Sequence, residues 1–171
     1  MVAWNKLYRK DCLQNTNIRF PEGLFYEDVE FFYKILPTLS NIGFVKKPLL
    51  HYVQRPTSIS NTQTEKTKDI FTIFEHVFAF YKQEQIWDTY YTELEYTYTR
   101  YLLCSSLKRM SRVKDSKIRK ELWKKTWENL NSQFPSWKKN LILHKRSKKN
   151  CYMRTVNKWT YPIYCHLFQM I

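Results

Sequence analysis

Two adjacent acidic residues, Glu27 and Asp28, stand inside the most aromatic segment of the sequence, Arg19–Leu36. A carboxylate with aromatic walls has a pKa raised by desolvation. Such a carboxylate can take a proton from a hydroxyl group, which is the work of a general base. The same pair also stands at the start of a predicted helix, where negative charge stabilises unpaired N–H groups. Two roles therefore stay open, helix capping and base catalysis, and each acid can take one of them.

A second candidate group lies in the polar stretch that begins HYVQRPTSIS. Arg55, together with His51 and Ser58, combines a guanidinium, an imidazole and hydroxyl groups on one predicted loop. Arginine and hydroxyl donors suit a phosphate or a diphosphate. The alternative is an ordinary polar loop without a ligand.

A third candidate group is formed by Trp4 and Lys6. A tryptophan ring can stack on a sugar ring, and the lysine can reach an anion. The alternative is a core tryptophan beside a surface lysine, as is common at the edge of a hydrophobic core.

Hydrophobic periodicity predicts which elements hold these residues. Helical spacing is expected over 27–36, ended by Pro37, and again over about 69–81, 86–110 and 116–130. Two short β-prone runs, 42–45 and 49–53, predict a strand pair. A strand pair is not stable alone. The sequence therefore predicts a mostly helical α/β chain whose strand pair either completes a sheet with another chain or belongs to a domain of which part is missing.

Composition narrows the function classes. The chain has two glycines and no G-x-G-x-x-G or P-loop motif, which argues against a glycine-rich phosphate loop. Its four cysteines lack the spacing of a zinc site. They are typical of reduced thiols in a cytoplasmic protein. No secretory leader is expected, and no apolar run is long enough for a membrane span.

Positive charge is concentrated at the end of the chain. Residues 108–171 hold 17 basic and 3 acidic side chains, which equals the net charge of +14 of the whole sequence. A basic block indicates nucleic acid, anionic lipid or a phosphorylated substrate as partner, unless it is simply a solvated surface. Because nucleic-acid motifs are absent and tryptophans and tyrosines are mixed in, nucleic acid is the less expected partner and peripheral membrane contact through 108–171 is favoured.

Three stretches follow one another in a specific order: WNKLYRKDCL, IRFPEGLFYEDVEFF and LLHYVQRPTSIS. In order and spacing they resemble the C-terminal half of bacterial family-2 glycosyltransferases with the GT-A fold. Sequences of that family contain three motifs in this order: W-x-K-L-[YF], F-x-E-G-x-x-[YF]-E-D-x-x-F and Y-x-x-R-x-x-S-I-S. The resemblance covers residues 2–61, about a third of the chain.

The resemblance implies an inverting transfer of a sugar from a nucleotide-sugar to a glycan or lipid-linked acceptor in capsular, exopolysaccharide or surface-glycan synthesis. Asp28 would be the catalytic base and Glu27 its companion. Trp4 and Lys6 would shape the acceptor pocket. The loop residues Arg55, His51 and Ser58 would close over the diphosphate.

One departure from the family is large, because this sequence contains no D-x-D metal motif. The complete enzyme is expected to use Mn²⁺ or Mg²⁺, and this chain alone is expected to bind no metal and to be inactive. We therefore expect residues 1–64 to be the acceptor side of a GT-A domain without its nucleotide-binding half. A helical extension, 65–134, and a basic aromatic tail, 135–171, would follow.

The alternatives are a basic membrane-surface or nucleic-acid-binding helical module and a non-catalytic helper of a nucleotide-binding chain. The expected location is the cytoplasm, with peripheral contact at the inner face of the membrane.

Overall fold

The computed structural model describes residues 3–14, 16–53 and 63–170, and these form two compact units. Unit 1 comprises the described residues up to 53 together with 69–84. Unit 2 comprises 63–68 and 85–170. The predicted division after residues 64 and 134 stays a prediction.

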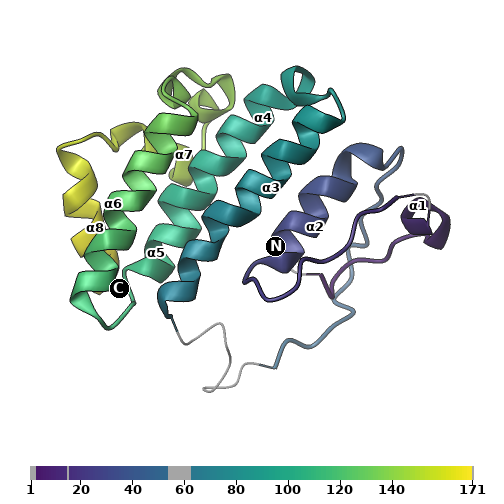
Figure 1. The fold of residues 1–171 in the computed structure, drawn as a ribbon, viewed down its shortest axis with the longest axis horizontal. Helices are drawn as coiled ribbons and strands as arrows, with labels where there is room; N and C mark the ends of the chain where they lie inside the picture. The colour runs from purple at the N-terminus through teal and green to yellow at the C-terminus, as the bar shows by residue number, and fades with distance from the viewer. Residues whose placement is uncertain (1–2, 15, 54–62, 171) are drawn as a thin grey trace. The chain divides into compact units, whose positions relative to one another are not determined.

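Unit 1 is built around two neighbouring helices, α2 (Glu27–Ile35) and α3 (Asp69–Gln83), which lie side by side in Figure 1. A short helix, α1 (Lys10–Gln14), precedes them. A 3-10 turn that contains Pro37, Leu36–Thr38, follows α2 directly, since proline cannot continue the helix. The sequence predictions of helices over 27–36 and 69–81 are confirmed.

The core of unit 1 follows from the apolar spacing of α3. The residues on one face are fully or almost fully buried: Ile70, Ile73, Phe74, Val77, Phe78 and Tyr81. Tyr81 also donates a hydrogen bond from its hydroxyl to the carbonyl of Tyr33 at 2.9 Å. Apolar contact and this bond together fix α2 against α3.

The predicted strand pair is wrong. The described residues contain helices and turns but no strand, and every residue from 41 to 53 is exposed. The β-prone side chains of this segment stand largely in solvent: Ile42, Phe44, Val45, Leu49, Leu50, Tyr52 and Val53. Strand propensity reflects packing on a half-buried surface, and no sheet among the described residues offers one.

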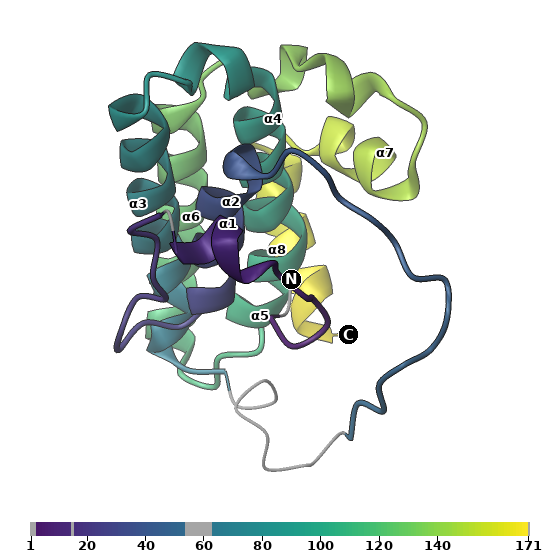
Figure 2. The same ribbon diagram turned by 90° about the vertical axis from the view of Figure 1, so that its right-hand side faces the viewer.

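Unit 2 contains five helices and several 3-10 turns in its described residues. The helices are α4 (Trp87–Arg100), α5 (Leu107–Met110), α6 (Ser116–Gln133), α7 (Lys148–Thr155) and α8 (Thr160–Met170). The 3-10 turns are Glu65–Lys68, Trp137–Lys139 and Leu141–His144. Figure 1 shows α6 beside α5, and Figure 2 shows α8 running beside α5.

The long helix predicted over 86–110 is present, with one irregularity. A π-helical segment, Tyr101–Ser106, joins α4 to α5. The π geometry interrupts the regular ladder of backbone hydrogen bonds. The hydroxyl of Tyr152 in α7 donates to the carbonyl of Leu103 at 3.0 Å, which ties this irregular segment to the rest of unit 2.

Two buried asparagines bind the segment after α6 to α4. The amide of Asn140 donates to the Thr92 carbonyl and to Glu95 Oε2, both at 2.8 Å. Asn150 accepts a hydrogen bond from the Tyr96 hydroxyl at 2.9 Å. Because buried amides need partners, these bonds select one position for the chain after residue 134.

None of the helices in the described part of the chain has both the length and the apolar character that a membrane span requires.

Candidate functional site

Asp28 lies in the first turn of α2. The cap position itself belongs to Tyr26, whose φ of 69° is left-handed, and no side chain caps the helix there. A left-handed tyrosine is strained. The turn is held in place by Asp69, whose Oδ2 accepts a hydrogen bond from the N–H of Phe25 at 3.0 Å. The first residue of α3 therefore fixes where α2 begins.

Asp28 is half-buried, whereas its neighbour Glu27 is exposed. Burial raises the pKa of the Asp28 carboxyl, and the negative charge of Glu27 raises this pKa further. Backbone N–H groups act in the opposite direction but do not outweigh these two causes. Asp28 is thus a stronger base than an ordinary aspartate.

The raised pKa of Asp28 has a consequence for stability. The folded state holds the Asp28 proton to a higher pH than the unfolded state, so the free energy of unfolding falls as pH rises above the ordinary value of 3.8. We expect Asp28→Asn to raise the free energy of unfolding at pH 7 by about 0.5 kcal/mol, a small gain because the group is half exposed and solvent screens it. The gain should disappear below pH 3.8.

Urea unfolding of both proteins at pH 7 and pH 3.5 measures this difference. A variant that is less stable than the wild type at pH 7 would contradict the raised pKa. Glu22→Gln is the matched control, because Glu22 is exposed and stands outside α2.

Lys6 lies over the same face of α2 as Asp28. Its ammonium nitrogen is 5.3 Å from the ring centre of Phe32, and Phe32 follows Asp28 by one helical turn. The ammonium also donates a hydrogen bond to Asn5 Oδ1 at 2.6 Å. Lys6 therefore lies over the α2 residue that is one helical turn beyond Asp28.

Trp4 is half exposed and stacks on Tyr52, with ring centres 5.3 Å apart and planes 9° from parallel. The interpretation of Trp4 as a core residue is therefore wrong. The stack joins the first and third stretches of the sequence pattern, which are far apart in the chain. Two exposed, stacked rings offer a flat apolar surface of the kind that sugar rings contact.

The predicted diphosphate group is described in part. His51 is exposed and adjacent to Tyr52 of the stack. Arg55 and Ser58 lie outside the described residues, and their roles stay predictions.

The third acid of the segment, Glu30, has a structural role that the sequence pattern does not reveal. Its carboxylate is almost fully buried and accepts hydrogen bonds from Lys34 at 2.6 Å and from His76 at 2.8 Å. The Glu30–Lys34 spacing of four residues predicts their pairing on a helix. The contact with His76 on α3 has no signal in the sequence, because it depends on how α2 and α3 pack.

Unit 1 also has a cleft of about 730 Å³ at the other end of α2. The residues lining it include Asp11, Arg19, Lys34 and Glu84, but none of the predicted site residues. Lys34 and Asp28 are six positions apart, which is about 9 Å along a helix. This cleft was not predicted from the sequence, and its residues form no motif there.

No group of three or more His, Cys, Asp or Glu side chains within the described ranges is arranged to hold a metal ion. The chain matches no protein-family model, no curated protein and no solved structure.

Proposed function

We propose that unit 1 is the acceptor side of an inverting, nucleotide-sugar-dependent glycosyltransferase of bacterial capsular, exopolysaccharide or surface-glycan synthesis. One observation carries this proposal: Asp28 is a half-buried carboxylate with a raised pKa, at the position that the family pattern gives to the base. The Trp4–Tyr52 stack and Lys6 above Phe32 support it, since they add a sugar-sized apolar surface and a cation to the same unit.

In the proposed reaction, the Asp28 carboxylate takes the proton of an acceptor hydroxyl. The acceptor oxygen then forms a bond to the anomeric carbon of the donor sugar. The bond between that carbon and the diphosphate oxygen breaks, and the nucleoside diphosphate leaves with its electron pair. Because attack and departure occur on opposite sides of the carbon, the anomeric configuration inverts.

The donor side of the reaction rests on the sequence resemblance. A nucleotide-binding half would hold the nucleotide-sugar and a divalent Mn²⁺ or Mg²⁺, which would offset the charge of the leaving diphosphate. Arg55, His51 and Ser58 would close over that diphosphate from this chain. The reaction would take place in the cytoplasm, where nucleotide-sugars are available, at the inner face of the membrane if the acceptor is lipid-linked.

Acceptor binding is the direct test of unit 1. We expect the chain to bind a subset of glycans on an array of bacterial oligosaccharides, and Trp4→Ala to weaken that binding about tenfold through the loss of about 1.4 kcal/mol of ring contact. Titration followed by calorimetry measures the affinity. The matched control is Trp159→Ala, which removes an exposed tryptophan from unit 2 and should leave glycan affinity unchanged.

Two results would contradict the proposal. The first is a chain that binds none of the glycans. The second is an equal loss of affinity in both tryptophan variants. A parallel titration with UDP-sugars and Mn²⁺ should give no heat of binding, and a clear signal would place a donor site within this chain.

A further inference from the structure

The last helix of unit 2 presents an uncovered apolar face. Trp159, Ile163, Leu167 and Met170 follow one another at helical spacing, and they are 75%, 59%, 46% and 84% exposed, respectively. Singly exposed apolar residues are common at protein surfaces. Three of them lie on one face of the 11-residue helix and Trp159 directly precedes it, so the four form a continuous stripe, which marks a contact surface.

The opposite face of α8 fixes the direction of this stripe. The Tyr161 hydroxyl donates to the carbonyl of Trp123 at 2.8 Å, and the carbonyl of Cys165 accepts a hydrogen bond from Ser111 Oγ at 3.3 Å. Both Tyr161 and Cys165 are buried. Because α8 is held by its inner face, the apolar stripe points away from the body of unit 2.

The stretch of sequence that ends in this helix carries charge of one sign. After Glu128 the sequence contains eight basic residues and no acidic residue. All eight are exposed: Lys138, Lys139, Lys145, Arg146, Lys148, Lys149, Arg154 and Lys158. Lys158 places its ammonium nitrogen 4.9 Å from the ring centre of Trp159, so positive charge lies directly beside the stripe.

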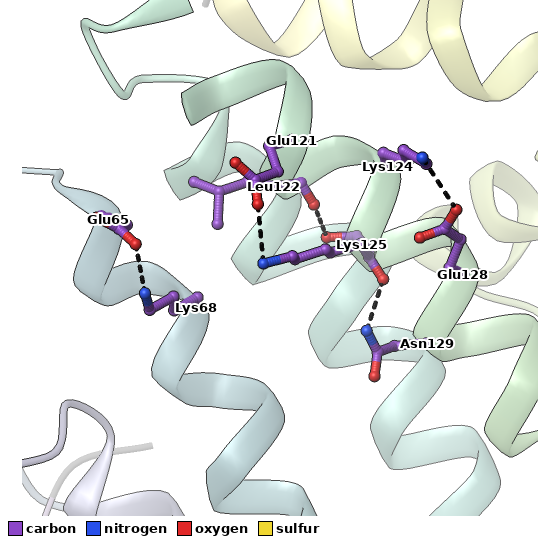
Figure 3. Close-up of polar contacts among 9 residues, drawn as sticks. Glu65, Lys68, Glu121, Leu122, Lys124, Lys125, Glu128 and Asn129 are labelled. Atoms are coloured by element: carbon purple, nitrogen blue, oxygen red, sulfur yellow. Dashed lines mark hydrogen bonds and ion pairs between the residues drawn. The ribbon is translucent and has the colours of Figure 1, made fainter. Parts of the chain in front are cut away.

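The three acidic side chains within residues 108–128 each bind a neighbouring residue of α6. Figure 3 shows Glu121 paired with Lys125 and Glu128 paired with Lys124 on the surface of α6, at 2.9 Å and 3.7 Å. Asp115 caps α6 by accepting the N–H groups of Lys117 and Ile118. These acids therefore do not balance the basic side chains that follow them.

An apolar stripe without charge, with Lys158 at its edge and seven further exposed basic side chains in the preceding segment, fits a helix that lies in the surface of an anionic bilayer. With 11 residues α8 is about 16 Å long, well short of the 30 Å hydrocarbon core. Nucleic acid fits less well, because α8 carries no lysine or arginine to meet a phosphate.

We propose that unit 2 binds the surface of a membrane rich in anionic lipid. Trp159, Ile163, Leu167 and Met170 enter the boundary between headgroups and acyl chains, and the basic side chains contact the lipid phosphates. Binding at this face does not depend on an acceptor site in unit 1.

The test is sedimentation of the full chain with vesicles of phosphatidylcholine, with or without about one third phosphatidylglycerol. We expect retention on the anionic vesicles, and a loss of partitioning of at least about tenfold in the double variant Ile163→Gln, Leu167→Gln. Leu141→Gln is the matched control, because Leu141 is even more exposed, at 78%, but lies outside α8. It should bind within about twofold of the wild type.

Insertion is measured separately with brominated lipids, which quench tryptophan fluorescence on contact. Quenching in the wild type should remove the share of the emission that Trp159 contributes, one of six tryptophans, and it should be largely lost in Trp159→Phe. Equal retention of the double variant and the Leu141 control would overturn the proposed face. If the chain is retained on the vesicles but its tryptophan fluorescence is not quenched, it only adsorbs to the surface, and the proposed insertion of Trp159 is wrong. Preferential binding of a DNA or RNA duplex, unaffected by the α8 substitutions, would assign the basic surface to nucleic acid instead.

Discussion

Turnover of a nucleotide-sugar is expected to fall by a factor of about 10²–10⁴ when Asp28 is replaced by asparagine. Asparagine has nearly the same shape but cannot take a proton, so the acceptor hydroxyl would have to attack without a base. The measurement needs an enzyme in which this chain follows the nucleotide-binding half of a family-2 glycosyltransferase. Release of nucleoside diphosphate, followed in a coupled assay, reports the rate.

The pH profile separates base catalysis from a general disturbance of the site. Activity of the wild type should fall on acidification through the pKa of Asp28, which lies above the ordinary 3.8 because of burial and the charge of Glu27. Glu27→Gln removes that charge, so it should move the acidic limb to lower pH with a much smaller loss of rate. If Asp28→Asn keeps a third or more of the wild-type turnover, the base is another group.

The helices could be predicted from the sequence because their signal is local. The apolar spacing of Ile70, Phe74 and Val77 is enough to mark α3, and the same residues form the core of unit 1. Asp115 likewise starts α6 as a side-chain cap, which is a local bond between neighbouring residues.

The strand prediction failed because a strand depends on partners that the local sequence does not contain. Residues 42–45 and 49–53 have the composition of strands, but a strand needs a neighbour for its backbone hydrogen bonds and a surface for its side chains. Neither is present within the described residues, and the segment is exposed coil. The π-helical segment was missed for a related reason, since composition does not distinguish π from α geometry.

The site residues also fall into two groups, those whose position local signals predict and those that only packing brings together. Glu27 and Asp28 could be placed at the start of a helix from sequence alone, because that position depends on local signals. The stack of Trp4 on Tyr52 joins residues 48 positions apart, and no periodicity indicates it. The buried contact between Glu30 and His76 is equally non-local. Contacts of this kind arise from packing, which a single sequence does not display.

The largest effect on stability is expected in unit 2, from Asn150→Leu. The Asn150 side chain is 2% exposed and makes three hydrogen bonds. Its amide donates to the carbonyls of Ile142 and Lys145 at 2.9 Å and 2.8 Å, and its oxygen accepts from the Tyr96 hydroxyl at 2.9 Å. Leucine has a similar shape but makes none of them, so the partners lose their bonds in a buried site.

At about 1 kcal/mol for each bond, we expect Asn150→Leu to lower the free energy of unfolding by about 3 kcal/mol. Five of the six tryptophans belong to unit 2, so urea unfolding followed by tryptophan fluorescence reports mainly on that unit.

Asn129→Leu is the matched control, because the Asn129 amide bonds to the Lys125 carbonyl at the surface of α6 (Figure 3) and solvent can replace it there. The control should change stability by less than about 0.5 kcal/mol. Equal effects of the two substitutions would mean that Asn150 does not hold α7 and the preceding turn against α4, and that apolar packing alone positions the chain after residue 134.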